Sequence, residues 1–336
     1  MTAEKWYRKT GEQGDVVIST RIRLARNLQR FPFPDRMTTE QRQEVVAAVK
    51  DAAAGEGLHY LSMENTPRRD ALSMAERHLI SPEFAACKPG SGLLLSDDEG
   101  ISIMINEEDH LRLQVMRAGL DLDDAYAQAD RLDSRLDEKL QFAFDKRLGY
   151  LTQCPTNLGT GMRASLMLHL PALEERGAIQ QLANTVSKLG LTIRGIYGEG
   201  SKPEGAIYQL SNQVTLGISE LTAIQNLKGI ANQIIREERA AREQLCRNPH
   251  FEDRVWRSLG LLRTARLLTH QEFMMLISNL RVGIAMGMVE GVSLDTVSEL
   301  INDVQPATLM SAAGEDLEPE QRDALRAKLV REKLGS

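Results

Sequence analysis

Few cysteines and no long apolar segment are present in this chain. The 336 residues include three cysteines, at positions 87, 154 and 246. An odd number at scattered positions supports neither a disulfide framework nor a Cys-x-x-Cys metal site, so we expect reduced thiols. No window approaches the roughly 20 apolar residues of a membrane helix, and residues 1–8 carry no long apolar stretch. The sequence therefore predicts a cytoplasmic protein without membrane contact.

A strong charge imbalance is also missing. The 41 basic and 47 acidic residues give a net charge of −6, which does not support a general nucleic-acid-binding surface. The common phosphate-binding motifs are absent as well: there is no Gly-x-x-x-x-Gly-Lys-[Ser/Thr] loop and no protein-kinase motif set. Gly198-Glu199-Gly200 lacks the third glycine and the following helix of a dinucleotide fingerprint.

The chain is longer than one hydrophobic core usually organises, so we expect two domains, residues 1–247 and 248–336. Strands and helices are interleaved before residue 248, which is typical of an α/β or α+β catalytic domain. After Asn248-Pro249 no convincing strand follows, and helices are predicted over 251–268, 269–288, 293–301 and 319–334. In the first domain the patterns predict strands over 16–26, 93–95, 101–105, 162–170, 191–197 and 206–210, and helices over 38–54, 71–79, 121–144, 171–189 and 219–246.

Residues 154–165 combine a thiol, a turn-forming loop and a cation. Cys154 and Pro155 begin a loop that contains Gly159 and Gly161. Such a loop can bring backbone N–H groups against a charged ligand. It leads directly into a strand-like segment that carries Arg163.

Five arginines lie on or beside apolar strands or motif loops: Arg21, Arg23, Arg112, Arg163 and Arg194. Their guanidinium groups would repel one another if they converged without a counter-anion, so convergence would imply a polyanionic ligand such as a nucleoside triphosphate. Strict alternation places Arg21 and Arg23 on one face of a strand. Taken alone, that pattern also fits an edge strand with a solvated basic face.

Carboxylates occur in two places opposite these arginines. Glu107, Glu108 and Asp109 follow the strand 101–105, where their mutual repulsion would raise a pKa. The alternative is a solvated loop or an acidic helix start. Glu199 lies in a glycine-containing loop that would suit a lid or a substrate clamp. Together these acids could hold and deprotonate a cation.

Four stretches carry a family resemblance: residues 19–23, 106–112, 154–161 and 194–199. In this order they resemble the catalytic domain of the ATP:guanidino phosphotransferases, the creatine and arginine kinase family. Within that family the chain is similar to the bacterial protein-arginine kinases, because it lacks the small helical N-terminal domain of the metabolite kinases and adds a helical C-terminal domain. The resemblance implies an α+β fold with an antiparallel sheet flanked by helices, plus an all-helical C-terminal domain.

The resemblance also implies roles for individual residues. Glu108 is the expected base toward the guanidinium, Glu199 and Glu107 are further catalytic carboxylates, and the Cys154 thiol orients the guanidino group. ATP is the expected nucleotide, with Mg²⁺ held through its phosphates and no protein metal site. The expected nucleotide-binding residues are Ser19, Thr20, Arg21, Ile22, Arg23, His78, Arg112, Arg163, Ala164, Ser165, Leu166, Met167, Arg194, Gly195, Ile196, Tyr197, Gly198 and Glu199.

The activity implied is direct, in-line transfer of the γ-phosphoryl group of ATP to arginine side chains of proteins, which marks them for Clp-type proteolysis in a bacterial stress response. One alternative is a phosphagen kinase that acts on free arginine or a similar guanidino metabolite. Another is an inactive adaptor that binds phosphoarginine.

The C-terminal tail resembles a regulatory phosphoarginine pocket at Arg322, Asp323, Arg326 and Ala327. The two arginines are four apart and share a helix face, where they could hold a phosphate while Asp323 pairs with a guanidinium. Without the family, an ordinary solvated charged helix is the favoured explanation of the pattern. The partners implied are an activating zinc-binding protein of the McsA type, a Clp-family ATPase or protease, a stress-response repressor and a second copy of the chain.

Overall fold

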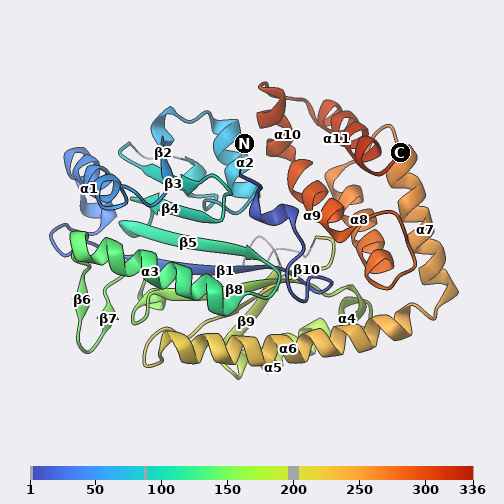
Figure 1. The fold of residues 1–336 in the computed structure, drawn as a ribbon, viewed down its shortest axis with the longest axis horizontal. Coiled ribbons are helices and arrows are strands. Elements are labelled where there is room, and N and C mark those ends of the chain that lie inside the picture. Colours follow the sequence, from blue (N-terminus) through green and yellow to red (C-terminus); the bar gives the residue numbers. More distant parts are fainter. Residues whose placement is uncertain (1–2, 87–88, 196–203, 336) are drawn as a thin grey trace.

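A single large antiparallel sheet forms the centre of the computed structural model, which describes residues 3–86, 89–195 and 204–335 (Figure 1). Within these residues the strand order is β2-β3-β4-β5-β1-β8-β10-β9, and every neighbouring pair is antiparallel. The strands are β1 Val17–Arg26, β2 Leu58–Ser62, β3 Gly92–Ser96, β4 Ile101–Ile105, β5 Leu111–Ala118, β8 Met162–His169, β9 Leu191–Gly195 and β10 Ile207–Asn212. A short hairpin joins β6 Phe144–Asp145 to β7 Gly149–Tyr150. The predicted antiparallel α+β fold is confirmed.

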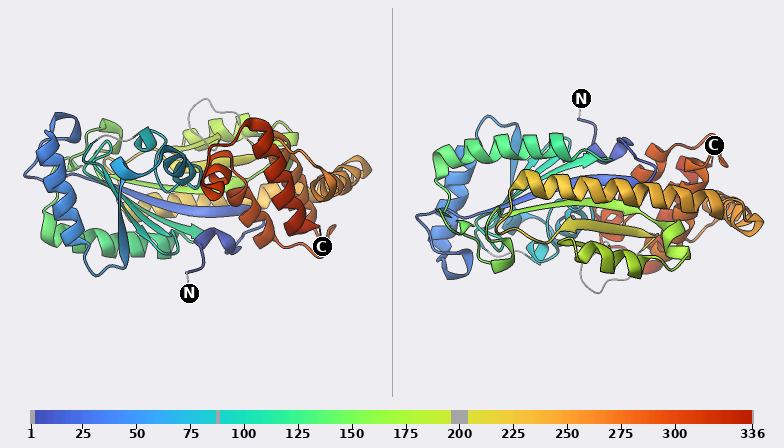
Figure 2. Two further views of the ribbon diagram at one scale, coloured as in Figure 1. Left: turned by 90° about the horizontal axis from the view of Figure 1, so that it is seen from above. Right: turned by 90° about the horizontal axis from the view of Figure 1, so that it is seen from below.

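One face of the sheet is covered by α1 Thr39–Ala52, α3 Leu122–Leu140 and α6 Glu220–Leu245, which contact β4, β1, β5, β8 and β10. Figure 2 shows α6 running along the length of the sheet. Side chains such as Ile22, Leu24 and Leu166 point into the core between the sheet and these helices. The alternate residues of the same strands therefore face the opposite side, where the predicted arginines lie.

The C-terminal part is helical: α7 Pro249–Thr264, α8 His270–Ala285, α9 Leu294–Asp303, α10 Pro306–Ala313 and α11 Pro319–Leu334. It has a hydrophobic core of its own, to which β1, β8 and β10 add Ile18, Met167 and Ile207. A third, smaller core lies on the face of the sheet opposite α1, α3 and α6, where α2 Arg68–Glu76 packs against β3, β4 and β5. Helix α2 also contacts α10 (Figure 1).

Several boundaries differ from the prediction. The helix predicted over 121–144 ends at Leu140, because Gln141 adopts a left-handed backbone with φ of 55°. The segment 171–189 forms two helices, α4 Pro171–Glu175 and α5 Ile179–Ser187, separated by the left-handed Gly177. Helix α2 begins at Arg68 and ends at Glu76, so His78 lies beyond its end.

Among the strands and α-helices, β2, β5, β6, β7 and α10 were not predicted. For the three carboxylates 107–109, the alternative of a solvated loop is correct only in that they lie in a turn, since Asp109 is buried; Arg112 lies on β5. Only residues 106–110 form the turn between β4 and β5. No helix in the described part of the chain is long and apolar enough to span a membrane.

Candidate active site

All five predicted arginines line one cavity of about 270 Å³. Arg21 and Arg23 come from β1, Arg112 from β5, Arg163 from β8 and Arg194 from β9. Because β5, β1 and β8 are neighbours and Arg23 pairs directly with Arg163, the alternation of each strand brings these side chains to the same face. The predicted convergence is confirmed, and the alternative of a solvated basic edge strand is wrong.

Burial and mutual repulsion lower the pKa values of basic side chains that line this cavity. Burial lowers the pKa of Arg21 to about 10, and the charges of Arg163 and Arg112 act in the same direction. The pKa of Arg23 is lowered well below its usual value, again chiefly by burial. Burial beside Arg21 and Arg23 lowers the pKa of His78 to about 3, so its ring is neutral at pH 7. Such a concentration of buried cations favours a polyanionic ligand.

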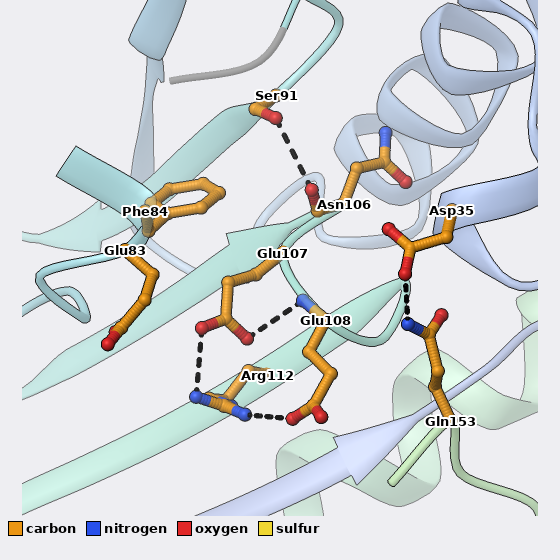
Figure 3. A pocket seen from close by; sticks show the side chains of 9 residues that line it. All are labelled: Asp35, Glu83, Phe84, Ser91, Asn106, Glu107, Glu108, Arg112 and Gln153. Carbon is orange, nitrogen blue, oxygen red and sulfur yellow. Dashed lines mark hydrogen bonds and ion pairs between the residues drawn. The ribbon is translucent and has the colours of Figure 1, made fainter. Parts of the chain in front are cut away.

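A second, acidic cavity of about 470 Å³ adjoins the first (Figure 3). Arg112 and Glu83 line both cavities. The remaining lining residues of the acidic cavity are Asp35, Phe84, Ser91, Asn106, Glu107, Glu108 and Gln153. A cation in the acidic cavity would therefore lie next to an anion in the arginine-lined one.

Arg112 joins the two cavities through a fork of ion pairs. Its Nη1 donates to Glu107 Oε1 at 3.0 Å, and its Nη2 donates to Glu108 Oε2 at 3.0 Å (Figure 3). The Ser81 hydroxyl donates to the same Glu107 oxygen at 2.7 Å. Arg112 thus fixes both carboxylates while its own charge faces the arginine-lined cavity.

Glu108 is the carboxylate best suited to accept a proton. Burial raises the pKa of its carboxyl above the usual value, and the charges of Asp109 and Glu107 add to this. Arg112 and a hydrogen bond with Cys154 oppose the increase. The result is a carboxylate with a raised pKa, about a third of whose side chain is exposed, at the mouth of the acidic cavity.

The loop that begins at Cys154 lies beside both the carboxylate Glu108 and the arginines. A third cavity, of about 220 Å³, is lined by Cys154, Glu108 and Arg112 together with Arg23 and Arg163. The Cys154 Sγ lies 3.0 Å from the Thr156 hydroxyl. The predicted meeting of thiol, loop and cation is therefore confirmed.

Several contacts hold this loop, among them the following two. The buried Asp109 Oδ1 accepts hydrogen bonds from the Gln153 backbone N–H at 2.7 Å and from Asn27 Nδ2 at 2.6 Å. Gly161 has φ of 60°, and a Cβ there would lie 2.6 Å from Arg26 Nη1 and 2.7 Å from the Ala25 carbonyl oxygen. A glycine is thus required for the close approach of the loop to β1.

Not every predicted nucleotide-binding residue faces the arginine-lined cavity. Ile22, Ala164 and Leu166 point into the helix-covered core, and the Thr20 hydroxyl donates to the Gly119 carbonyl at 2.7 Å. These side chains therefore cannot reach a ligand on the arginine face. The Ser165 hydroxyl contacts the Arg21 carbonyl, and Gly195 lines the cavity. Ile196, Tyr197, Gly198 and Glu199 lie outside the described residues.

Ser19 and Met167 line a separate, largely apolar cavity between the sheet and α9. His78 lines this cavity and the arginine-lined one. A ligand that extends past His78 would therefore reach the helical part of the chain.

The C-terminal arginines lie differently from each other. Arg326 is 1% exposed and donates to the Val304 and Leu268 carbonyls at 3.0 and 2.8 Å and to Asp323 Oδ1 at 2.6 Å. Arg322 is partly exposed and donates to the Leu317 carbonyl at 3.3 Å. Ala327, like Arg326, is buried. A fully solvated charged helix is therefore wrong for Arg326, which ties α11 to the chain around it.

Sequence reasoning missed several residues of the site. Gln209 accepts a hydrogen bond from Arg21 at 3.1 Å, and Ser211 accepts from Arg163 at 3.3 Å. Both alternate with the core residues Tyr208 and Leu210 of β10. That alternation was the available signal. Asp35 comes from the short 3₁₀ helix Pro34–Arg36, Ser81 and Glu83 come from an irregular segment, and their sequence surroundings offered no such signal.

Among the residues that the structure describes, no group of three or more His, Cys, Asp or Glu side chains is arranged to hold a metal ion.

Two families of known proteins match the chain. Residues 40–241 match the ATP:guanido phosphotransferase C-terminal catalytic domain, and residues 248–336 match the protein-arginine kinase McsB C-terminal domain. A "Protein-arginine kinase" of Halothermothrix orenii is 47% identical over 98% of this chain and 96% of its own length. Another of that name, from Desulforamulus reducens, is 45% identical over 99% of this chain and 96% of its own.

Solved structures of guanidino kinases have a similar fold. A lombricine kinase superposes with a TM-score of 0.62 at 26% identity, covering 69% of this chain and 68% of its own. The duplicated taurocyamine kinase from Schistosoma mansoni superposes with a TM-score of 0.59 at 29% identity, covering 67% of this chain and 34% of its own.

Proposed function

Because the chain belongs to the ATP:guanido phosphotransferase family and, within it, to the protein-arginine kinases, we propose that it transfers the γ-phosphoryl group of ATP to arginine side chains of proteins. The observation that carries this proposal is the fork of Arg112, which lies between a cavity suited to a polyanion and a cavity suited to a cation. The nucleotide phosphates occupy the first cavity and the acceptor guanidinium the second. Their reacting atoms then meet beside Arg112 and Glu108.

The acceptor must lose a proton to become a nucleophile. An arginine side chain has a pKa above about 12 and is a poor nucleophile while protonated. Glu108 accepts that proton as a guanidino nitrogen forms its bond to the γ-phosphorus and the bond to the bridging oxygen of ADP breaks. The raised pKa of Glu108 matches this task. Glu107 and, outside the described residues, Glu199 serve as further carboxylates toward the guanidinium.

The arginines serve the phosphate side of the reaction. Phosphoryl transfer passes through a loose transition state, so alignment and neutralisation of charge are the main tasks of the protein. Gln209 and Ser211 orient two of these arginines before the nucleotide arrives. Mg²⁺, held by the nucleotide itself, would add to the neutralisation. We assign the nucleotide role to the side chains that face the cavity and to His78.

Cys154 has an orienting role in this proposal. Its thiol hydrogen-bonds Glu108 and lines the third cavity together with Glu108 and Arg112. From there it would orient the guanidino group electrostatically. Transfer is direct, and no phosphorylated enzyme is formed.

We further propose that residues 1–247 form the catalytic domain and residues 248–336 a regulatory domain. Arg322, Asp323, Arg326 and Ala327 form its phosphoarginine site, for which the exposed edge of Arg322 is the available contact. Apolar side chains exposed on and beside α7 and α8 support a homodimer through this domain: Trp256, Leu261, Leu267 and Met275. The further partners are a McsA-type activator, a Clp-family ATPase or protease and a stress-response repressor, in the cytoplasm.

The test compares acceptors by mass. The protein is incubated with ATP and Mg²⁺ and either an unfolded protein or free arginine, and acid-labile mass increases of one phosphoryl group are counted. We expect them on the unfolded protein. Modification of free arginine alone would indicate a phosphagen kinase, and no transfer to either acceptor would indicate an adaptor.

A variant tests the role of Glu108. Glu108→Gln is expected to keep nucleotide binding while reducing phosphoarginine formation by on the order of 10²-fold or more, because the proton acceptor is lost. Undiminished turnover would remove Glu108 from the mechanism.

A further inference from the structure

Helix α10 receives its N-terminal cap from the catalytic part of the chain. Its own N-cap residue, Gln305, makes no side-chain capping hydrogen bond. Instead, Glu76 at the end of α2 accepts from the Ala307 and Thr308 backbone N–H groups, each at 2.8 Å, and from the Thr308 hydroxyl at 3.1 Å. Pro306 has no N–H, so Glu76 satisfies the first two free donors of the helix and places a negative charge at its positive end.

Other contacts extend this junction along α2. The Ser311 hydroxyl donates to Asp70 at 2.7 Å, and Ser73 contacts the Thr308 hydroxyl at 3.1 Å. Asp70, Ser73 and Glu76 are three residues apart and therefore share one face of α2. One face of α2 is thus in contact with α10.

The segment that follows α2 lines both cavities of the active site. His78 turns the chain with a left-handed backbone, φ 61°, and lines the arginine-lined cavity. The next carbonyl, of Leu79, is fixed by hydrogen bonds from Ser102 and Gln114. Ser81 then donates to Glu107. The sheet thus fixes this segment at Leu79, and α2 fixes it at its other side, so the position of α2 contributes to where His78 lies relative to the nucleotide.

We propose that Glu76 is a positioning residue through which the C-terminal helices set His78 and the nucleotide site. This inference rests on the proposed function, because it assigns His78 to nucleotide binding. The proposed phosphoarginine site connects to the same junction. Arg322 approaches Met310 of α10, and Arg326 donates to the Val304 carbonyl two residues before α10. A ligand on these arginines would bias α10, and α10 would act on His78 through Glu76.

The test uses Glu76→Gln with a matched control in the full-length protein. Asp295→Asn also removes a carboxylate that joins the two parts, since Asp295 accepts from the Thr10 backbone N–H at 2.7 Å and from its hydroxyl. It does not contact α2. The affinity for a non-hydrolysable ATP analogue is measured without acceptor, together with kcat, the KM for ATP and the melting temperature.

We expect Glu76→Gln to weaken nucleotide binding and raise the KM for ATP by about five- to tenfold, less than the full loss of a charge-assisted hydrogen bond because Glu76 acts on the nucleotide only through the position of His78, with a smaller effect on kcat. Asp295→Asn should leave both values within about twofold at a comparable change of melting temperature. Equal weakening in the two variants, or unchanged affinity in Glu76→Gln, would overturn the coupling.

Two further variants separate the possible failures. His78→Asn removes the ring but tolerates the left-handed backbone, and adding Glu76→Gln to it should cause no further loss if Glu76 acts through His78. Additive losses would overturn that route. Asp70→Asn, a milder change at the same junction, should shift the KM in the same direction if Glu76→Gln does not fold, and an unchanged KM there would contradict the coupling. Absence of nucleotide binding by the wild type would overturn the proposed function itself.

Discussion

Replacing Arg112 by lysine tests the link between the two cavities. The guanidinium donates one hydrogen bond to Glu107 and one to Glu108, each at 3.0 Å, from two different nitrogens. A lysine keeps the positive charge but carries a single nitrogen on a flexible stem. It can pair with one carboxylate at a time, so the other loses its fixed position.

The size of the effect follows from the lost bond. A hydrogen bond between charged groups contributes about 1.5–3 kcal/mol, which corresponds to a reduction of kcat/KM by about 10- to 150-fold if the bond is needed in the transition state. Arg112 is only 15% exposed, so solvent compensates little of this loss. The reduction should appear in kcat as well as in KM, because Glu108 must be aligned while it accepts the proton.

The assay is the initial rate of phosphoarginine formation on an unfolded protein at varied ATP. Arg117→Lys provides the control, because Arg117 lies on the same strand and pairs with Gln128 at 2.8 Å away from both cavities. The control should stay within about twofold of the wild type. A wild-type kcat/KM for Arg112→Lys would refute the argument that the fork aligns the two reactants.

Three further predictions concern pH and stability. The pKa of Glu108 is raised, and Glu108 acts as a base only when deprotonated. As the pH is lowered, kcat/KM should therefore begin to fall at a pH above the usual pKa of a glutamate. A kcat/KM that stays constant down to that usual pKa would contradict this. Gly161→Ala should destabilise the fold by about 2 kcal/mol in urea, because the added Cβ meets Arg26 and the backbone is left-handed; an unchanged midpoint would contradict the close approach. Glu238→Ala should lower the free energy of unfolding by about 3–5 kcal/mol, because the fully buried Arg242 loses its carboxylate partner at 2.7 Å. A small change in thermal unfolding would indicate that another group compensates the charge of Arg242.

The sequence identified what depends on local pattern. Alternation in β1 placed Arg21 and Arg23 on one face, and the structure confirms this. The same rule applied to β5 would have found Leu111, Leu113 and Val115 alternating with Arg112, but the three acids before them drew attention to a loop. The acidic cavity was only partly predicted, because Asp35 on the 3₁₀ helix Pro34–Arg36 and Glu83 in a loop reach it from segments whose positions depend on tertiary packing.

Helix α10 shows a physical limit of reasoning from sequence. A helix start is recognised by a capping side chain beside it, yet the cap of α10 is Glu76, which is separated from Ala307 by 231 residues. Eight residues without a local cap are too few to form a stable isolated helix in water. Pro306 in the first turn and the left-handed Gly314 at the end are local signals for α10, but its capping carboxylate comes from α2, and this dependence couples the C-terminal helices to the segment that carries His78 and Ser81.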